Sequence, residues 1–151
     1  MKSAGISWIN YSKEVCPMKD DVVINKVMVI KRCMDRINEV YAGNTDNLQD
    51  YTKQDSIVLN IQRSCEAAID LAMHVVAEKK LGLPQSSREA FKLLNQNGII
   101  DDALSSRLEA MVWFRNIAVH DYQSINLVIV RKIIEEHLQD FGVLAIKVLE
   151  Y

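Results

Sequence analysis

The residues best suited to chemistry lie near the end of one apolar segment, where Arg115, Asn116, His120 and Tyr122 occur within eight positions. At about 100° per residue, Arg115 falls on an otherwise apolar helical stripe, in a place where a leucine is expected. An ionised guanidinium buried there alone would cost many kcal/mol, so it is either paired with a carboxylate or faces a polar cleft. A paired arginine and a hydrogen-bonded core histidine would explain either residue singly, but their clustering favours a functional site.

Carboxylates that could pair with Arg115 occur on the long apolar segment 57–80. Glu66, Asp70 and His74 recur there at steps of four and share one helical face. We expect Glu66 or Asp70 to be the counter-ion of Arg115. The same face could be half of a carboxylate metal site, but such a site needs Glu-x-x-His on two helices, and the glutamates before His137 are one and two positions away. No metal or cofactor is therefore expected.

The elements that must position these residues are predicted to be helices. Hydrophobic residues recur at steps of three and four in five successive segments, approximately 20–43, 57–80, 86–98, 102–120 and 124–151. Because the loops between them are short, we predict an all-α fold, an antiparallel up-and-down bundle of about five helices. The fourth segment is apolar on nearly all sides and is expected to be central.

Capping residues set the expected helix starts. Ser86, followed three positions later by Glu89, has the pattern of a capping box for the third helix. Asp101 is the expected cap of the fourth helix, and Ser124 that of the fifth. The polar stretch 43–55 is predicted to be a connector.

Composition supports one helical domain. The chain has 151 residues and 17.2 kDa, with 49% hydrophobic and 25% charged residues but only five glycines and two prolines, too few for the turns of a β-sandwich. No apolar run is long enough to span a membrane. We assign residues 18–151 to the domain and 1–17 to an appendage of unknown role. Three widely spaced cysteines indicate reduced thiols and a cytoplasmic protein.

The net charge is −2, so a polyanion would have to be met by a local basic patch. Two modest candidates occur, Lys79 and Lys80 with Arg88, and Arg131 with Lys132. Either group is more commonly a solvated helix end. The sequence also lacks a glycine-rich phosphate loop and a G-x-S-x-G motif, so nucleotide hydrolysis and acyl transfer have no support.

The segment from Arg115 to Tyr122, RNIAVHDY, resembles the R-x4-H-x-Y signature of HepT-like proteins, toxins of the HEPN superfamily of small all-helical ribonucleases. Asn116, directly after the arginine, is a polar residue that many HEPN members carry there. The resemblance covers the helical order from about Met18 to Tyr151. It implies metal-independent RNA cleavage in a cleft between two protomers.

The resemblance gives each motif residue a role that suits its chemistry. His120 would accept the proton of a ribose 2′-hydroxyl, since imidazole titrates near neutral pH. Arg115 would hold two oxygens of the transition-state phosphate. Asn116 would orient a phosphate or hold the imidazole tautomer, and Asp121 is a supporting residue. Tyr122 occupies the position that receives AMP from the partner in the best-understood members.

The resemblance also implies partners. These are RNA, with tRNA a common target in the family, a second copy of the chain, and a cognate minimal nucleotidyltransferase (MNT) antitoxin. The alternative is that the chain is a non-catalytic helical protein that helps such a nucleotidyltransferase bind its substrate. An arginine on a core stripe favours the enzyme, because a scaffold has no need of it.

The spacing of Arg115 and His120 does not by itself bring the two side chains together. Residues five apart are separated by about 140° around a helix, so Arg115 and His120 do not converge on one face. Either the helix ends or bends before His120, or a second copy completes the cleft across a two-fold axis, with each protomer supplying an arginine and a histidine.

Overall fold

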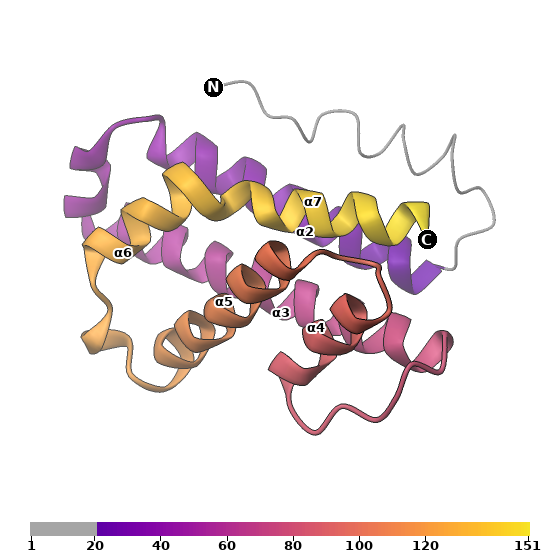
Figure 1. Cartoon of the computed structure of the whole chain (residues 1–151). Coiled ribbons are helices and arrows are strands. Elements are labelled where there is room, and N and C mark those ends of the chain that lie inside the picture. The colour runs from indigo at the N-terminus through magenta and orange to yellow at the C-terminus, as the bar shows by residue number, and fades with distance from the viewer. Residues whose placement is uncertain (1–20) are drawn as a thin grey trace.

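The computed structural model describes residues 21–151, which form a bundle of helices without a strand in that range (Figure 1). The predicted all-α class is confirmed. The longer helices are α2 (Asp21–Tyr41), α3 (Tyr51–Glu78), α4 (Ser87–Gln96), α5 (Asp102–His120), α6 (Leu127–Lys132) and α7 (Leu138–Glu150). A π-helical turn, η4 (Ile133–His137), joins α6 to α7, and two short 3-10 helices are η2 (Thr45–Gln49) and η3 (Tyr122–Ser124).

The helices pack in two layers around one core. In Figure 1, α2 and α3 form the rear layer, and α5 and α7 lie across them with α4 beside α5. The largest fully buried side chains come from both layers and include Ile30, Ile37, Ile61, Leu71, Phe91, Leu108, Phe141 and Leu144. Burial of these side chains is the main stabilising term, at about 1.5–3 kcal/mol for each. Helix α5 is thereby held against both α3 and α7.

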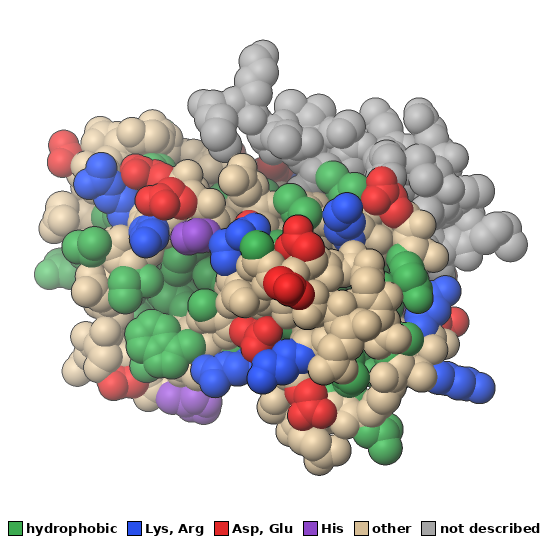
Figure 2. Space-filling model, viewed as in Figure 1, with side chains coloured by type: hydrophobic (Ala, Val, Ile, Leu, Met, Phe, Trp, Pro, Cys, Tyr) green, Lys and Arg blue, Asp and Glu red, His purple; other side chains and the backbone are tan. Residues whose placement is uncertain are grey.

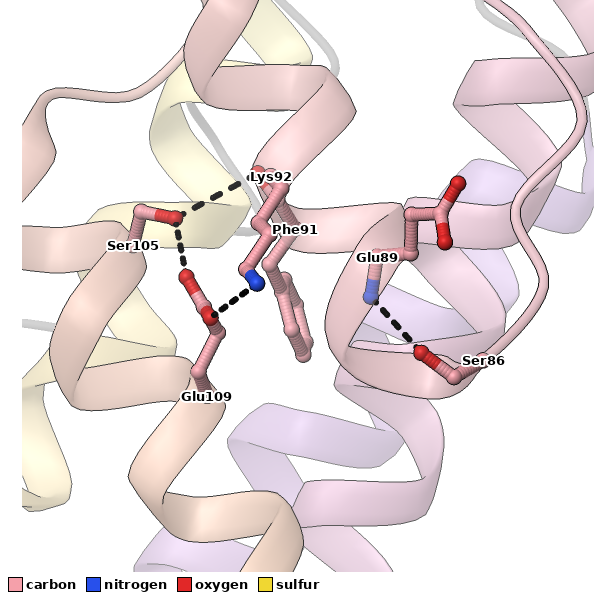
Figure 3. A network of polar contacts seen from close by, with 6 residues as sticks. All are labelled: Ser86, Glu89, Phe91, Lys92, Ser105 and Glu109. Atoms are coloured by element: carbon pink, nitrogen blue, oxygen red, sulfur yellow. Dashed lines mark hydrogen bonds and ion pairs between the residues drawn. The ribbon is translucent and has the colours of Figure 1, made fainter.

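Two predicted caps are confirmed. Ser86 Oγ accepts a hydrogen bond from the backbone N–H of Glu89 at 3.2 Å (Figure 3). Asp101 Oδ1 accepts one from the N–H of Leu104 at 2.8 Å, so α5 begins where the sequence indicates. Each cap satisfies one backbone donor that the first helical turn leaves free.

The predicted cap of the last helix is wrong. Ser124 lies in η3, and its hydroxyl donates to Asp121 Oδ2 at 2.5 Å. The cap of α6 is Asn126, whose Oδ1 accepts from the N–H of Val128 at 2.8 Å. Serine and asparagine cap helices about equally well, so the short 3-10 turn after α5 decides between them.

The second helix also begins earlier than expected. The stretch 43–55 was predicted to be a connector, but it contains η2 and the first turn of α3. Asp50 Oδ1 accepts from the N–H of Lys53 at 3.1 Å and starts α3 at Tyr51. The first turn of α3 is exposed and polar, so hydrophobic spacing does not reveal it.

A small polar network fixes α5 against α4 (Figure 3). Ser105 donates to Glu109 at 2.9 Å, and Lys92 on α4 lies 3.8 Å from the same carboxylate. Ser105 Oγ is also 3.5 Å from the carbonyl oxygen of Phe91. Because Ser105 is buried, these contacts set the register of the helix that carries the motif.

A buried carboxylate ties α5 to the last helix. Asp140 accepts from Arg107 Nε at 3.0 Å, and His137 Nδ1 lies 3.4 Å from the same oxygen. Arg107 is on α5, and His137 ends the π-helical turn. The contacts of Asp140 with Arg107 and His137 therefore fix the turn that separates α6 from α7.

Some sequence predictions concern the chain ends. The boundary predicted at residues 17 and 18 lies outside the described residues and stays a prediction. Within residues 21–151, no helix is long and apolar enough to cross a membrane. Cys33 and Cys65 are buried and are not in a disulfide.

Candidate functional site

Arg115 is half-buried on α5 and forms a hydrogen bond with its neighbour. Its Nε donates to Oδ1 of Asn116 at 2.9 Å. The prediction that Glu66 or Asp70 is its counter-ion is wrong. Asp70 faces α2 and is paired with Lys26 at 3.0 Å.

Glu66 is not the ion-pair partner of Arg115 either. It accepts a 3.3 Å hydrogen bond from Gln62 on its own helix. Burial raises the pKa of the Cys65 thiol, while the charge of Arg115 lowers it and that of Glu66 raises it further. Arg115 is thus not paired with a carboxylate within residues 21–151.

His120 is the last residue of α5 and is exposed. The N–H of Asp121 donates to the carbonyl of Ile117 at 2.8 Å, so the helix continues through His120. An ending of the helix before His120, one of the two expected arrangements, is therefore ruled out. Arg115 and His120 remain about 140° apart around one helix.

Tyr122 follows in η3, where its side chain is 41% exposed. Its hydroxyl donates a hydrogen bond to Oδ1 of Asp55, which lies near the start of α3. Burial, followed by this hydrogen bond and the charge of Asp55, raises the pKa of Tyr122 to about 12. Tyr122 therefore stays neutral near pH 7 and is held in a fixed direction.

Asp55 was not singled out in the sequence. It lies 67 positions from Tyr122, and no periodicity relates the two. Asp121, expected as a supporting residue, accepts from Ser124 and stabilises the turn that places Tyr122.

An apolar hollow lies beside the motif on α5. It has a volume of about 240 Å³ and is lined by Met111, Trp113 and Phe114 on α5 and by Ile129 and Ile133 opposite. Figure 2 shows hydrophobic side chains gathered around this depression over α5 and α6.

The rim of this hollow carries both apolar and basic side chains. Trp113 is 49% exposed, and Val119 on α5 and Val128 on α6 are also exposed, at 45% and 75%. Arg107, Lys132 and His137 complete the lining. Apolar exposure of this kind next to polar groups is typical of an interaction surface.

The face of α3 that was considered as half of a metal site makes other contacts. Asp70 is paired with Lys26, and Glu66 is hydrogen-bonded to Gln62. In the part of the chain that the structure describes, no three His, Cys, Asp or Glu side chains are grouped so that they could hold a metal ion.

A helical bundle whose central helix ends in R-x4-H, with the tyrosine of H-x-Y in the turn that follows, has the features of the HEPN class of ribonucleases. Residues 30–148 match the family described as Ribonuclease HepT-like, and the chain belongs to this family. It is 52% identical over 122 residues to the mRNA nuclease HepT of Shewanella oneidensis, which covers 81% of this chain and 92% of that protein. The chain is thus an enzyme, a nuclease of the toxin–antitoxin class.

Solved structures agree with this assignment. A crystal structure of a toxin–antitoxin with AMP-PNP contains a chain that matches with a TM-score of 0.81 at 48% identity, covering 86% of this chain and 99% of that one. A tri-AMPylated HEPN toxin of Shewanella oneidensis in complex with an MNT antitoxin matches with a TM-score of 0.80 at 51% identity, covering 84% and 96%. The predicted family and helical fold are confirmed, and the non-catalytic alternative loses its support.

Proposed function

We propose that this chain is the toxin of a toxin–antitoxin pair and that it cleaves RNA without a metal ion. The observation that carries the proposal is the state of Arg115, whose only hydrogen bond within residues 21–151 is to the neutral side chain of Asn116. A guanidinium without a carboxylate partner is free to bind phosphate in a bidentate manner. His120 is exposed on the same helix end.

The proposed reaction is attack of a ribose 2′-oxygen on its own 3′-phosphate. His120 takes the proton of the 2′-hydroxyl, and the new bond from oxygen to phosphorus forms as the bond to the 5′-oxygen breaks. Arg115 stabilises the charge on the non-bridging oxygens. The products are a 2′,3′-cyclic phosphate and a 5′-hydroxyl, which receives a proton from a general acid.

In-line displacement places the base and the acid on opposite sides of the phosphate, so one imidazole cannot serve both roles at once. We propose a homodimer in which the second copy supplies the second His120 across a two-fold axis. The continuous helix supports this, because Arg115 and His120 point in different directions on one chain. The apolar hollow around Trp113 offers a surface for the second copy.

The homodimer leads to a first prediction. Light scattering should return about twice the chain mass of 17.2 kDa at micromolar concentration. Trp113→Asp should shift the mass toward one chain and lower cleavage, because a charge in the apolar hollow opposes burial. Leu83→Asp is the matched control, since Leu83 is 85% exposed outside the hollow. A wild-type mass of a single chain at all concentrations would contradict the shared site.

A second prediction concerns metal. Cleavage of a labelled RNA should continue in EDTA, and mass spectrometry should find a 2′,3′-cyclic phosphate or its hydrolysis product. The reason is that the proton transfer is assigned to an imidazole rather than to a metal-bound water. Loss of cleavage in chelator, with recovery on addition of a divalent ion, would instead direct attention to Glu66, Asp70 and His74.

We also propose a cognate MNT-type nucleotidyltransferase antitoxin as the partner and Tyr122 as the residue to which it adds AMP. The exposed ring and the outward position after α5 support this assignment. The RNA target is proposed at the level of class: mRNA, by similarity to the named relative, or tRNA. Sequencing of the 5′-hydroxyl ends that appear after expression of the chain distinguishes the two.

A further inference from the structure

A groove follows the seam between α2 and α3, outside the motif. It has a volume of about 480 Å³. Each helix supplies residues at the spacing i, i+3, i+4 and i+7, so one face of each helix forms one wall. The lining is Val29, Arg32, Cys33 and Arg36 from α2, and Ser56, Leu59, Asn60 and Arg63 from α3.

The groove concentrates positive charge in a chain whose net charge is −2. Arg32, Arg36 and Arg63 are all exposed. Arg36 lies 3.7 Å from Glu39, a distant and solvent-exposed ion pair. Within residues 21–151, the side chains of Arg32 and Arg63 form neither a hydrogen bond nor an ion pair.

The guanidiniums of Arg32 and Arg63 line opposite walls of the groove. Both lower the pKa of the buried Cys33 thiol against the larger effect of burial, although Arg63 is on α3 and Cys33 is on α2. Like charges on facing walls repel each other, and no carboxylate lines the groove to offset this repulsion. Such an arrangement is favourable when an anion occupies the groove.

The floor of the groove is polar but neutral. Asn60 is buried, and its Nδ2 donates to the carbonyl of Ser56 at 2.8 Å. Ser56 itself is half-buried at the groove wall. Hydroxyl and amide groups with arginines above them suit a phosphodiester, which needs donors and a compensating charge.

The groove begins next to the motif. Ser56 directly follows Asp55, the residue that holds the Tyr122 hydroxyl. Arg63 lies about two helical turns further along α3. A strand bound at Arg115 and leaving past Tyr122 would therefore reach Ser56 first and the arginines next.

We propose that the groove between α2 and α3 binds the phosphodiester backbone of the RNA strand beyond the cleavage site, with Arg32 and Arg63 each holding one phosphate. This inference rests on the proposed ribonuclease function and extends it to a second contact region on the substrate. RNA is favoured over a protein segment, because the groove walls offer guanidiniums and polar groups, and Leu59 is the one large hydrophobic side chain of the lining that is exposed by more than a third. Contacts to phosphates position a strand without reading its bases.

Binding is tested in the His120→Ala background, in which RNA stays intact, with a fluorescently labelled single-stranded RNA of about 20 nucleotides. Adding Arg32→Ala and Arg63→Ala should raise Kd by about tenfold at moderate salt. The slope of log K against log salt should fall by about 1.4, or about 0.7 for each lost phosphate contact. The matched control is Arg88→Ala with Lys147→Ala, which removes two exposed cations outside the groove.

A second readout separates the groove from catalysis. With His120 intact, the Arg32→Ala, Arg63→Ala enzyme should cleave a dinucleotide at the wild-type rate, while KM for the long RNA rises. If the wild type cleaves no RNA but the groove variant binds RNA more weakly than its parent, the proposed reaction is contradicted. The RNA-binding role of the groove is then still supported. Equal RNA binding by the variant and its parent would contradict the proposal that the groove binds RNA. Loss of antitoxin binding alone would contradict it as well.

Discussion

Replacing His120 by alanine is expected to lower the rate of RNA cleavage by a factor of about 10² to 10⁴, the usual contribution of general acid–base catalysis. In a dimer with two shared histidines, both the base and the acid are lost at once. Growth arrest caused by expression of the chain alone should disappear. The measurement is kcat on a labelled RNA, together with growth after induction.

The substitution leaves the fold intact, which makes the result interpretable. His120 is exposed at the end of α5, and alanine favours a helix more than histidine does. The free energy of unfolding should change by less than about 0.5 kcal/mol. His74→Ala is the matched control, because it removes the same side chain from α3, away from the motif. A His120→Ala protein that keeps most of the wild-type rate would contradict the proposed mechanism.

Two variants of Arg115 distinguish the effect of its charge on cleavage from the effect of its planar geometry in the same assay. Arg115→Lys keeps a cation but loses the planar fork, so kcat should fall well below the wild-type value and remain above that of Arg115→Ala. Equal rates for the two variants would mean that bidentate binding, rather than charge, carries the effect.

Local features of the fold were predictable from the sequence. The apolar periodicity of α2 and α3 arises from one buried face, and a cap such as Asp101 acts within three residues of itself. The place of Arg115 on α5 follows from the same periodicity. Errors occur where two local solutions are nearly equal in energy, as with Ser124 and Asn126 at the start of α6.

Contacts between helices were not predictable in the same way. Asp70 is on the long helix expected to pair with Arg115, but the rotation of α3 turns it to Lys26. The Tyr122–Asp55 hydrogen bond and the arginine groove depend on which helix faces are adjacent. Spacing along one helix contains no information about these rotations, because core packing of the whole bundle determines them.

Tyr122→Phe is expected to leave the toxin folded and active but to abolish its neutralisation through AMP addition. The phenol oxygen would attack the α-phosphorus of a nucleoside triphosphate and release pyrophosphate, and phenylalanine has no such oxygen. Cleavage should persist, because the proposed reaction assigns no proton transfer to the phenol. The measurement is the intact mass of the chain after co-expression with the nucleotidyltransferase, together with growth.

The structure also predicts how the phenol loses its proton. With a pKa of about 12, Tyr122 is neutral at pH 7 and needs a proton acceptor during the transfer. Asp55 already accepts the hydrogen bond from this hydroxyl. Asp55→Asn should therefore slow AMP addition while leaving RNA cleavage intact. Tyr41→Phe is the matched control, because Tyr41 donates to Glu135, also has a pKa raised to about 12, and is buried away from the motif.

The charge of Arg115 explains why modification would silence the enzyme. Each AMP adds a phosphodiester with a negative charge next to a guanidinium that lacks a carboxylate partner within residues 21–151. The added phosphate would then occupy the place of the RNA phosphate. Additions of AMP mass that map to Tyr122 and vanish in Tyr122→Phe are the expected result. A chain that stays unmodified yet is still neutralised would mean that the antitoxin acts by covering the site.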